Sequence, residues 1–238
     1  MVKAESVGLS SSKLALMDKV MAERYVESGK LPGFHIAVLR DDEIAHSSVV
    51  GSMDLERNKP LQEDSIYRIY SMSKPITAVA LMMLVEEGQL GLDDDVHLHI
   101  PSWKDLRVYV SGMPSLVADG ASQFLTARPA RHMKVVDLVT HTSGLTYGFM
   151  SRTSVDAAYR KQKIGDLQTP GGLDEFVDQL SKLPLDFSPG ENWNYSVSID
   201  VMGYLVQKLS GQTFGEFLRT RIFERLGMND TDFHVPNE

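Results

Sequence analysis

The sequence predicts an α+β fold, with an antiparallel β-hairpin near the N-terminus and a mainly helical part after it. Two apolar, β-rich runs at 34–39 and 44–50 are separated by the polar tetrad at 40–43, a pattern typical of a hairpin. Two apolar segments, 76–85 and 196–209, are long enough to form helices. Strands and helices that occupy separate parts of a chain are typical of the α+β class.

The region before the hairpin is predicted to be an amphipathic helix over residues 12–28. Its apolar face is expected to contain Leu14, Met17, Met21 and Tyr25. Glycine and proline residues then end the helix before the first strand. The two histidines of the hairpin, His35 and His46, are interpreted as packed or surface residues rather than as ligands.

The segment 70–88 is the predicted centre of the fold. Nearly every residue from 76 to 85 is apolar, so we expect a helix that is buried on every side. Pro75 fits the first turn, because backbone N–H groups there have no partner within the helix. Gly88 provides a C-terminal stop.

The rest of the chain alternates between predicted loops and predicted helices. Two stretches, 104–131 and 146–171, are rich in polar, Gly and Pro residues and are interpreted as long surface loops. Such loops often form binding edges in enzymes. Helices are predicted at 134–140, 173–183, 196–209 and 214–226, the last of them capped by Thr213.

The chain shows no internal repeat and no clean domain boundary. Its 238 residues can bury one sizeable core. We therefore interpret residues 1–238 as a single catalytic region. It would consist of an N-terminal helix and hairpin (12–70) and a mainly helical part (71–238).

Two polar side chains, Ser71 and Lys74, stand at the start of the central helix. Residues three apart on a helix are neighbours, so the hydroxyl and the amine should face each other. Desolvation and the helix dipole both disfavour the ammonium, so we expect the pKa of Lys74 to fall. A neutral lysine can accept a proton from serine, as a nucleophilic serine requires. Backbone N–H groups at the helix start can hold a developing oxyanion.

The S-x-x-K spacing alone is weak evidence, because the chain contains a second copy at Ser10 and Lys13. That copy lies in a polar run at the start of an amphipathic segment, where Ser10 or Ser11 is interpreted as a helix N-cap. Only the copy at Ser71 and Lys74 opens an almost fully apolar helix. Its context therefore favours a nucleophile–base pair.

Tyr195 stands at the entry to the second apolar helix, as Ser71 does at the first. Near a cationic lysine the pKa of a tyrosine falls, and the hydroxyl can then relay protons. The alternative is an ordinary half-buried tyrosine whose hydroxyl caps a neighbouring group. The residue by itself favours this alternative.

Composition excludes several classes of function. The net charge of −8 and a pI near 5.4 argue against nucleic acid or an acidic membrane surface as a partner. The absence of cysteine excludes disulfides and thiolate chemistry. No signal peptide or transmembrane segment is recognised, so a cytoplasmic location is expected.

An acidic triplet at 93–95 is followed by His97-x-His99, a pairing that suggests a metal site. No further ligand pattern accompanies it, so we interpret the stretch as a turn with a solvated acidic edge. Neither a metal nor a cofactor is predicted.

Three motifs together carry a resemblance to a known family. They are Y-S-M-S-K-P-I at 70–76, L-V-T-H-T-S-G-L at 138–145 and P-G-E-N-W-N-Y-S at 189–196. They resemble the serine β-lactamase/penicillin-binding-protein superfamily, in which S-x-x-K is a catalytic signature. The chain is most similar to the class C-like branch, and within it to the family VIII carboxylesterases. The resemblance extends from about residue 12 to the last residue.

The resemblance implies a β-lactamase/transpeptidase-like fold, in which an antiparallel sheet flanked by helices is joined to a helical region. It also implies that Ser71 is the nucleophile, Lys74 its base partner and Tyr195 the second acid/base. The implied activity is that of a serine carboxylesterase, which cleaves a small ester through an acyl-enzyme without a cofactor.

Two departures from the superfamily pattern bear on function. The tyrosine motif of its β-lactamases is Tyr-x-Asn, whereas this chain has Tyr195-Ser196-Val197. The missing amide is associated with positioning β-lactams, so its loss favours simple esters. A third motif, K-T-G or a variant, lies on a later strand in the superfamily and supplies an oxyanion N–H; nothing after Tyr195 matches it.

We therefore expect the C-terminal strands of the family to be missing from this chain. The chain would then be part of a longer protein, or its C-terminal portion would be supplied separately. Two alternatives to the esterase stay open: a β-lactamase or D-Ala-D-Ala carboxypeptidase, and a non-catalytic penicillin-binding-like module or inactive fragment. The acyl and alcohol preference and the oligomeric state cannot be read from the sequence.

Overall fold

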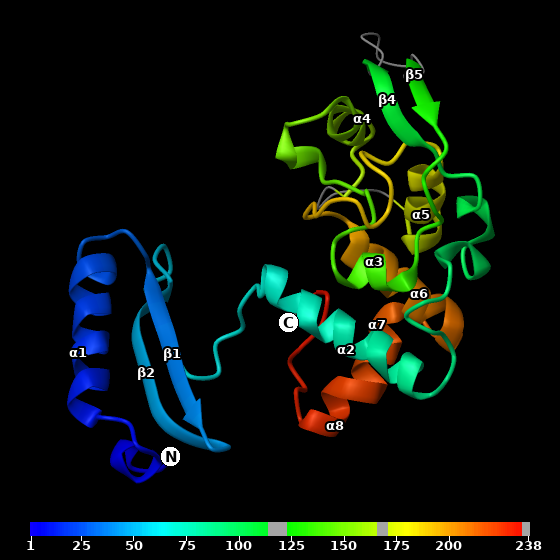
Figure 1. Cartoon of the computed structure of the whole chain (residues 1–238). Coiled ribbons are helices and arrows are strands. Elements are labelled where there is room, and N and C mark those ends of the chain that lie inside the picture. Colours follow the sequence, from blue (N-terminus) through cyan, green and yellow to red (C-terminus); the bar gives the residue numbers. More distant parts are fainter. Residues whose placement is uncertain (114–122, 166–170, 235–238) are drawn as a thin grey trace. The chain divides into compact units, whose positions relative to one another are not determined.

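The computed structural model describes residues 1–113, 123–165 and 171–234. The chain divides into two compact units, which we call the N-terminal unit (Met1–Arg68) and the helical unit (Ile69–Glu238) (Figure 1). That the two form one catalytic region stays a prediction.

The N-terminal unit contains the predicted hairpin. Strands β1 (Gly33–Arg40) and β2 (Glu43–Asp54) pair antiparallel, and a short strand β3 (Lys59–Pro60) pairs with the far end of β2. The turn residues Asp41 and Asp42 have φ angles of 53° and 61°. Two successive residues with positive φ match the right-handed twist of a hairpin, and a short polar side chain such as aspartate tolerates this conformation.

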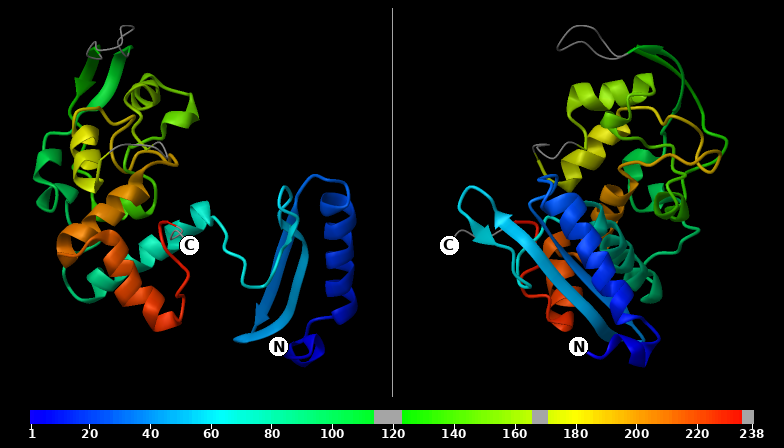
Figure 2. Two further views of the ribbon diagram at one scale, coloured as in Figure 1. Left: turned by 180° about the vertical axis from the view of Figure 1, so that it is seen from behind. Right: turned by 90° about the vertical axis from the view of Figure 1, so that its left-hand side faces the viewer.

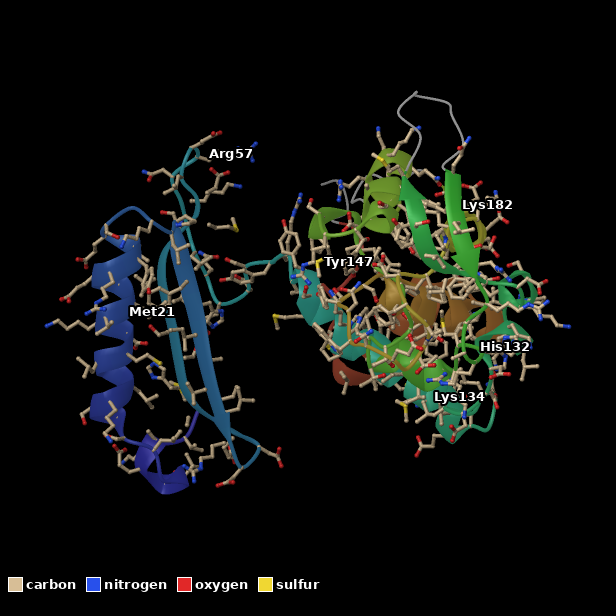
Figure 3. All side chains as sticks on the ribbon, turned by 45° about the horizontal axis from the view of Figure 1, so that its top comes forward. Met21, Arg57, His132, Lys134, Tyr147 and Lys182 are labelled. Atoms are coloured by element: carbon tan, nitrogen blue, oxygen red, sulfur yellow. The ribbon has the colours of Figure 1, made fainter. Side chains whose placement is uncertain are left out.

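Helix α1 (Ser11–Met21) accompanies the hairpin and continues into a π-helical turn, Ala22–Val26. The labelled Met21 side chain lies on the side of α1 that faces the strands (Figure 3). A π turn holds one more residue than an α turn, so it rotates the side chains that follow it. The prediction that Tyr25 belongs to the buried face is therefore wrong: the residue is 38% exposed.

The two histidines of the hairpin have structural partners, as interpreted from the sequence. His46 Nε2 lies 2.9 Å from the Asp18 carboxylate on α1, and this contact ties the helix to β2. His35 Nε2 lies 3.3 Å from Ser47 Oγ on the neighbouring strand.

The helical unit is built around helices α2 (Ser73–Glu86) and α6 (Ser198–Ser210), which pack against each other. The buried residues of α2 are Thr77, Ala80, Leu81 and Leu84, which share one face. The prediction that this helix is buried on every side is wrong, because Val79 is 53% and Met82 41% exposed. An apolar composition does not show how many neighbours a helix has, and α2 meets α6 with one face.

The other helices of this unit surround that pair, and their existence agrees with most of the sequence predictions. They are α3 (Val135–Val139), α4 (Ser154–Gln162), α5 (Leu173–Ser181), α7 (Phe214–Leu218), a π turn (Arg219–Phe223) and α8 (Glu224–Leu226). The predicted cap of the last helix is confirmed, since the Thr213 side chain accepts a hydrogen bond from the Glu216 N–H. Helices α2, α6 and α7 gather at one end of the unit (Figures 1 and 2).

The opposite end of the unit contains structure where loops were predicted (Figure 2). Strands β4 (Val108–Met113) and β5 (Gln123–Ala127) pair antiparallel within the supposed excursion at 104–131. Helix α4 lies within the supposed loop at 146–171. The two strands show no clean alternation of apolar and polar residues, because apolar Val110, Met113 and Leu125 are exposed. Tertiary contacts such as the Val108–Leu185 bridge support the pair. The predicted loop residues 114–122 and 166–170 lie outside the described residues.

Candidate active site

Ser71 lies in a 3₁₀ turn, Tyr70–Met72, that leads directly into α2. Tyr70 immediately before it has a φ of 44°, in the left-handed region that bulky side chains rarely adopt. This strained turn exposes Ser71, whereas Lys74 in the first turn of α2 is half-buried. Strained backbone of this kind persists where the surrounding structure enforces it, and it is common at active sites.

The three residues singled out in the sequence come together in the structure. Lys74 Nζ donates to Ser71 Oγ across 3.1 Å, and Tyr195 Oη lies 3.2 Å from the same oxygen. Lys74 Nζ also lies 4.9 Å from the centroid of the Tyr195 ring, within the range of a cation–π contact. The Ser71 hydroxyl therefore has two possible proton acceptors within hydrogen-bond distance.

The electrostatics of Tyr195 depend on Lys74. Partial burial by itself would raise the pKa of the Tyr195 hydroxyl. The hydrogen bonds with Lys74 and Ser71, together with the positive charge of Lys74, outweigh this effect and hold the pKa below its ordinary value. The phenolate is thus easier to form here than on a free tyrosine.

The second copy of the S-x-x-K spacing has the structural role predicted for it. The Ser10 side chain caps α1 by accepting a hydrogen bond from the Lys13 N–H. The acidic stretch at 93–95 behaves similarly: Asp94 accepts from the Gly91 N–H and contacts His99 at 3.2 Å. Within the described residues, no group of three or more histidine and acidic side chains is placed to hold a metal ion.

Hydrogen bonds from Asn194 to backbone carbonyls hold the second and third motifs side by side. The Asn194 N–H donates to the His141 carbonyl at 2.9 Å, and Asn194 Nδ2 donates to the Leu145 carbonyl at 3.1 Å. These bonds fix the chain on the N-terminal side of Tyr195. Gly144 allows the close approach, since it has a φ of 84° and an added Cβ would lie 2.3 Å from the Phe187 carbonyl oxygen.

The second motif is anchored in turn by a buried carboxylate on α3. Asp137 is 2% exposed and accepts two hydrogen bonds from the Arg131 guanidinium, at 2.7 and 2.8 Å. It also accepts from the Lys134 N–H at 2.8 Å and from Thr142 Oγ1 at 3.1 Å. Desolvation opposes the charge, but these donors outweigh it and keep the pKa of Asp137 below its ordinary value.

His141 is a site residue that sequence reasoning placed in a motif without giving it a role. Its ring centroid lies 5.0 Å from that of Tyr195 and 6.2 Å from that of Trp193. Its φ is 58°, a second strained position beside the site. Burial, followed by the charge of Lys74, lowers its pKa. Its place in the H-T-S-G-L motif was the only signal, because sequence spacing does not reveal a contact between rings.

Tyr147 and Asp200 complete the surroundings of Tyr195 and were not predicted. The rings of Tyr147 and Tyr195 lie 5.3 Å apart, and Tyr147 shares a side-chain hydrogen bond with Asp200 on α6. Desolvation raises the pKa of Asp200, while Lys74 and Tyr147 oppose the rise. Asp200 comes five residues after Tyr195. This spacing does not predict that the two residues are neighbours unless the first residue of α6 is known.

A cavity of about 900 Å³ opens beside Ser71 within the helical unit. Ser71, Lys74, Tyr195 and Asp200 contribute polar groups to its wall. Figure 3 shows the labelled Tyr147, another lining residue, near the start of α2. The apolar part of the wall includes six side chains: Phe149, Ile164, Leu173, Ile199, Phe214 and Phe233. An ester with an apolar acyl or alcohol group would meet complementary surface here.

Comparison with known proteins extends these observations. The family model described as Beta-lactamase matches residues 18–238 of the chain. Among curated proteins, Esterase EstB of Burkholderia gladioli is 31% identical over 231 residues, 96% of this chain and 53% of EstB. An uncharacterized protein of Mycobacterium tuberculosis is 32% identical over 210 residues, 88% of this chain and 49% of that protein. The chain spans about half the length of the curated relatives it matches.

Solved structures show the same relationship. The hydrolase EstCE1, described as having promiscuous acyltransferase activity, superposes with a TM-score of 0.77 at 25% identity. The match covers 95% of this chain and 55% of EstCE1. The D-alanine carboxypeptidase AmpC of Burkholderia cenocepacia has a TM-score of 0.64 at 23% identity, with 94% of this chain and 52% of AmpC covered. The architecture is therefore the predicted β-lactamase/transpeptidase-like fold.

Proposed function

This chain belongs to the Beta-lactamase family, and we propose that it is the serine-bearing part of a carboxylesterase that cleaves short-chain carboxylic esters. The observation that carries the proposal is the placement of Ser71 Oγ, 3.1 Å from Lys74 Nζ and 3.2 Å from Tyr195 Oη. A hydroxyl with two adjacent proton carriers is the arrangement that activates a serine nucleophile. The similarity to Esterase EstB further supports ester hydrolysis.

Acylation starts from the protonation state in which Lys74 has given up its proton and is no longer the cation that acts on Tyr195. Ser71 Oγ then attacks the ester carbonyl, and the Lys74 amine accepts the hydroxyl proton. The backbone N–H of Ser71 is the donor we assign to the developing oxyanion. Collapse of the tetrahedral intermediate breaks the bond to the alkoxide. Tyr195 gives its proton to this leaving group, and the lysine proton then passes to the phenolate. The products of this half-reaction are an alcohol and an acyl-enzyme on Ser71.

Deacylation uses the same groups in reverse. Water attacks the acyl carbonyl while Tyr195 or Lys74 accepts its proton. The Ser71 oxygen leaves, takes the proton back and releases the carboxylic acid. The lowered pKa of Tyr195 suits it to both directions of transfer, since a carrier works best when its pKa is near the working pH.

Esters are favoured over β-lactams by the residue two positions after Tyr195. Val197 is fully buried and stands where the superfamily's β-lactamases have the amide of Tyr-x-Asn. It therefore offers no polar group to a substrate in the cavity. A β-lactamase or D-Ala-D-Ala carboxypeptidase is the second candidate, and the similarity to AmpC supports only the shared fold.

The decisive experiment compares Ser71→Ala with Ser10→Ala on p-nitrophenyl butyrate. Removal of Ser71 should reduce kcat/KM by a factor on the order of 1,000 or more, as expected for a lost nucleophile, while Ser10→Ala keeps the wild-type rate. Equal residual activity in the two variants would remove Ser71 from the mechanism. A chromogenic cephalosporin, hydrolysed faster than the ester, would favour the second candidate instead.

A non-catalytic module is tested by covalent labelling. A fluorophosphonate should add one adduct to the wild-type protein and none to Ser71→Ala, read by intact mass. Folded wild-type protein without an adduct would support the binding module.

A small ester is the only partner that the proposal needs, and neither nucleic acid nor a membrane takes part. Among the described residues, none of the helices has the length and apolar character required to cross a bilayer. A cytoplasmic location remains part of the proposal.

A further inference from the structure

A chain of buried hydroxyl groups runs from the candidate site into the core. His141 Nδ1 lies 3.3 Å from Ser196 Oγ, which lies 2.8 Å from Ser198 Oγ. Ser198 Oγ is 2.8 Å from Ser143 Oγ, and Ser143 Oγ accepts a hydrogen bond of 3.2 Å from the Leu145 N–H. All three serines are fully buried. No sequence pattern reveals this row of hydroxyl groups, because the residues that it joins lie 55 positions apart.

The number of protons on these hydroxyl groups determines which group donates in each hydrogen bond. The Leu145 N–H donates into the Ser143 end, because a backbone N–H can only donate. The three links that remain, Ser143–Ser198, Ser198–Ser196 and Ser196–His141, are matched by three serine protons. If His141 Nδ1 accepts, every proton has an acceptor. If Nδ1 carried a proton, four donors would share three links.

A donor without an acceptor is costly at a fully buried position, because it loses its hydrogen bond to water and gains none in the protein. Both the Nδ1–H tautomer and the imidazolium would create such a donor here. The imidazolium would also place a second positive charge near Lys74, whose charge already acts on His141. The neutral ring with its proton on Nε2 is the state that satisfies the whole chain.

We propose that the serine chain holds His141 as the neutral Nε2–H tautomer and that His141 is thereby a positioning residue for Tyr195. The His141 ring lies against the ring of Tyr195, with centroids 5.0 Å apart, and Tyr147 packs against Tyr195 as well, at 5.3 Å. The His141 carbonyl also accepts from the Asn194 N–H, next to Tyr195 in the chain. The tyrosine is thus held through both its ring and its backbone.

The charged and titratable groups that act on His141 agree with this assignment. Lys74 on α2 repels a proton on the ring, and Tyr195 contributes a phenol that is neutral below its own pKa. Burial disfavours the imidazolium as well, so the pKa of His141 lies below its ordinary value. A neutral ring leaves Lys74 as the cation that acts on Tyr195.

The first test reads the tautomer without any substrate. In a long-range ¹H–¹⁵N spectrum of the labelled protein, His141 should show the Nε2–H pattern, with Nδ1 in the range of an unprotonated acceptor. His141→Asn assigns the signal, because asparagine tolerates the left-handed backbone and its Oδ1 can accept from Ser196. His141 should also stay neutral at a pH where a free histidine is protonated. An Nδ1–H pattern, or protonation of His141 at that pH, would overturn the proposal.

The second test breaks the chain at its centre. Ser198→Ala should give mixed tautomers and raise the pH at which His141 protonates, whereas Ser210→Ala, at the other end of α6, should change neither. Unchanged His141 signals in Ser198→Ala would contradict the proposed cause. The wild-type spectrum still tests the tautomer if this variant does not fold.

The positioning role rests on the proposed function and has its own readout. His141→Asn should lower kcat for an ester at least about tenfold with little change in KM, because a misplaced Tyr195 affects proton transfer rather than binding. Wild-type kcat in a folded His141→Asn protein would remove the positioning role. A wild-type protein with the expected tautomer but no esterase activity or fluorophosphonate adduct would instead contradict the proposed function, because the tautomer is measured independently.

Discussion

The amine of Lys74 lies 4.9 Å from the centroid of the Tyr195 ring while it donates a hydrogen bond to Ser71. One cation therefore acts on both hydroxyl groups of the site. It lowers the pKa of the tyrosine, and its bond to Ser71 fixes the position of the nucleophile. Because the lysine is linked to both groups, its removal should change both the pKa of Tyr195 and the rate of ester hydrolysis.

Removal of Lys74 as Lys74→Met is expected to raise the pKa of Tyr195, because the charge and the hydrogen bond that lower it disappear while burial remains. The ¹³Cζ signal of labelled Tyr195 during a pH titration measures this change. Lys208→Met is a matched control, since Lys208 Nζ lies 5.6 Å from the ring of Tyr204 in a pair outside the site. Ester hydrolysis should fall by about 100-fold or more in Lys74→Met alone. An unchanged titration of Tyr195 would show that Lys74 does not control it.

Asp137→Asn should destabilise the helical unit by about 2–3 kcal/mol, since the buried carboxylate that accepts from Arg131 and from the Lys134 N–H is lost. Urea unfolding monitored by tryptophan fluorescence measures the loss. Asp178→Asn is the control: its ion pair with Lys182 has a similar length of 2.7 Å but is exposed, so the change should stay below about 0.5 kcal/mol.

The contribution of Asp137 also has a definite pH dependence. Its pKa in the folded state is depressed, so its stabilisation is present above the unfolded-state pKa and is lost as the pH falls through the folded-state pKa. The difference between wild type and Asp137→Asn should therefore shrink in acid. A difference that is the same at every pH would contradict the role of the charge.

Asp186→Asn should stabilise the protein near neutral pH, in contrast to the change at Asp137. Burial raises the pKa of Asp186, and its Oδ1 has no hydrogen-bond partner among the described residues. A raised folded-state pKa means that stability is full below the unfolded-state pKa and is lost as the pH rises through the folded-state pKa. The neutral amide removes this loss.

The measurement is the free energy of unfolding of wild type and Asp186→Asn at several pH values. The gain should be largest at pH 7–8 and should disappear in acid, where the wild-type carboxyl is protonated. A gain that grows as the pH falls would contradict the assignment of Asp186 as a carboxyl that the fold prefers to keep neutral.

Gly144→Ala should cost more stability than Gly88→Ala, although both residues have positive φ. At Gly88 no atom lies within 4 Å of an added Cβ, so the cost is backbone strain of about 1–2 kcal/mol. At Gly144 the added Cβ would lie 2.3 Å from the Phe187 carbonyl oxygen, so the second motif must move away from the backbone at Phe187. Thermal unfolding measures both variants, and the esterase rate should fall only in Gly144→Ala. Equal shifts in melting temperature would show that the close approach is not required.

Much of the site could be predicted because part of it is local. Ser71 and Lys74 lie three residues apart at a helix start, so helix geometry alone brings their side chains together. Tyr195 is 124 residues from Ser71 in the chain, and its approach was inferred from a family resemblance rather than from the residues themselves. No spacing rule connects His141 or Tyr147 to that tyrosine, and both were missed as neighbours of it.

The predictions that were wrong share a physical cause. The residues 76–85 are apolar nearly throughout, yet α2 buries only one face. An apolar sequence indicates that a helix packs against a core, but it does not show how many other elements surround the helix. Strands β4 and β5 were taken for a loop, since exposed apolar residues such as Val110 and Leu125 obscure the alternation that is typical of a strand. Pairing with each other and with Leu185 supports them, and these contacts are not encoded locally.

The sequence by itself determined the hairpin, most of the helices and the pair at Ser71 and Lys74, because these depend on periodicity, caps and neighbours within a helical turn. Only the tertiary structure decided that Tyr195 meets this pair, and that three buried serines reach His141 behind it. Such contacts follow from the packing of distant segments, whose energies depend on shape and on complete hydrogen bonding in the interior.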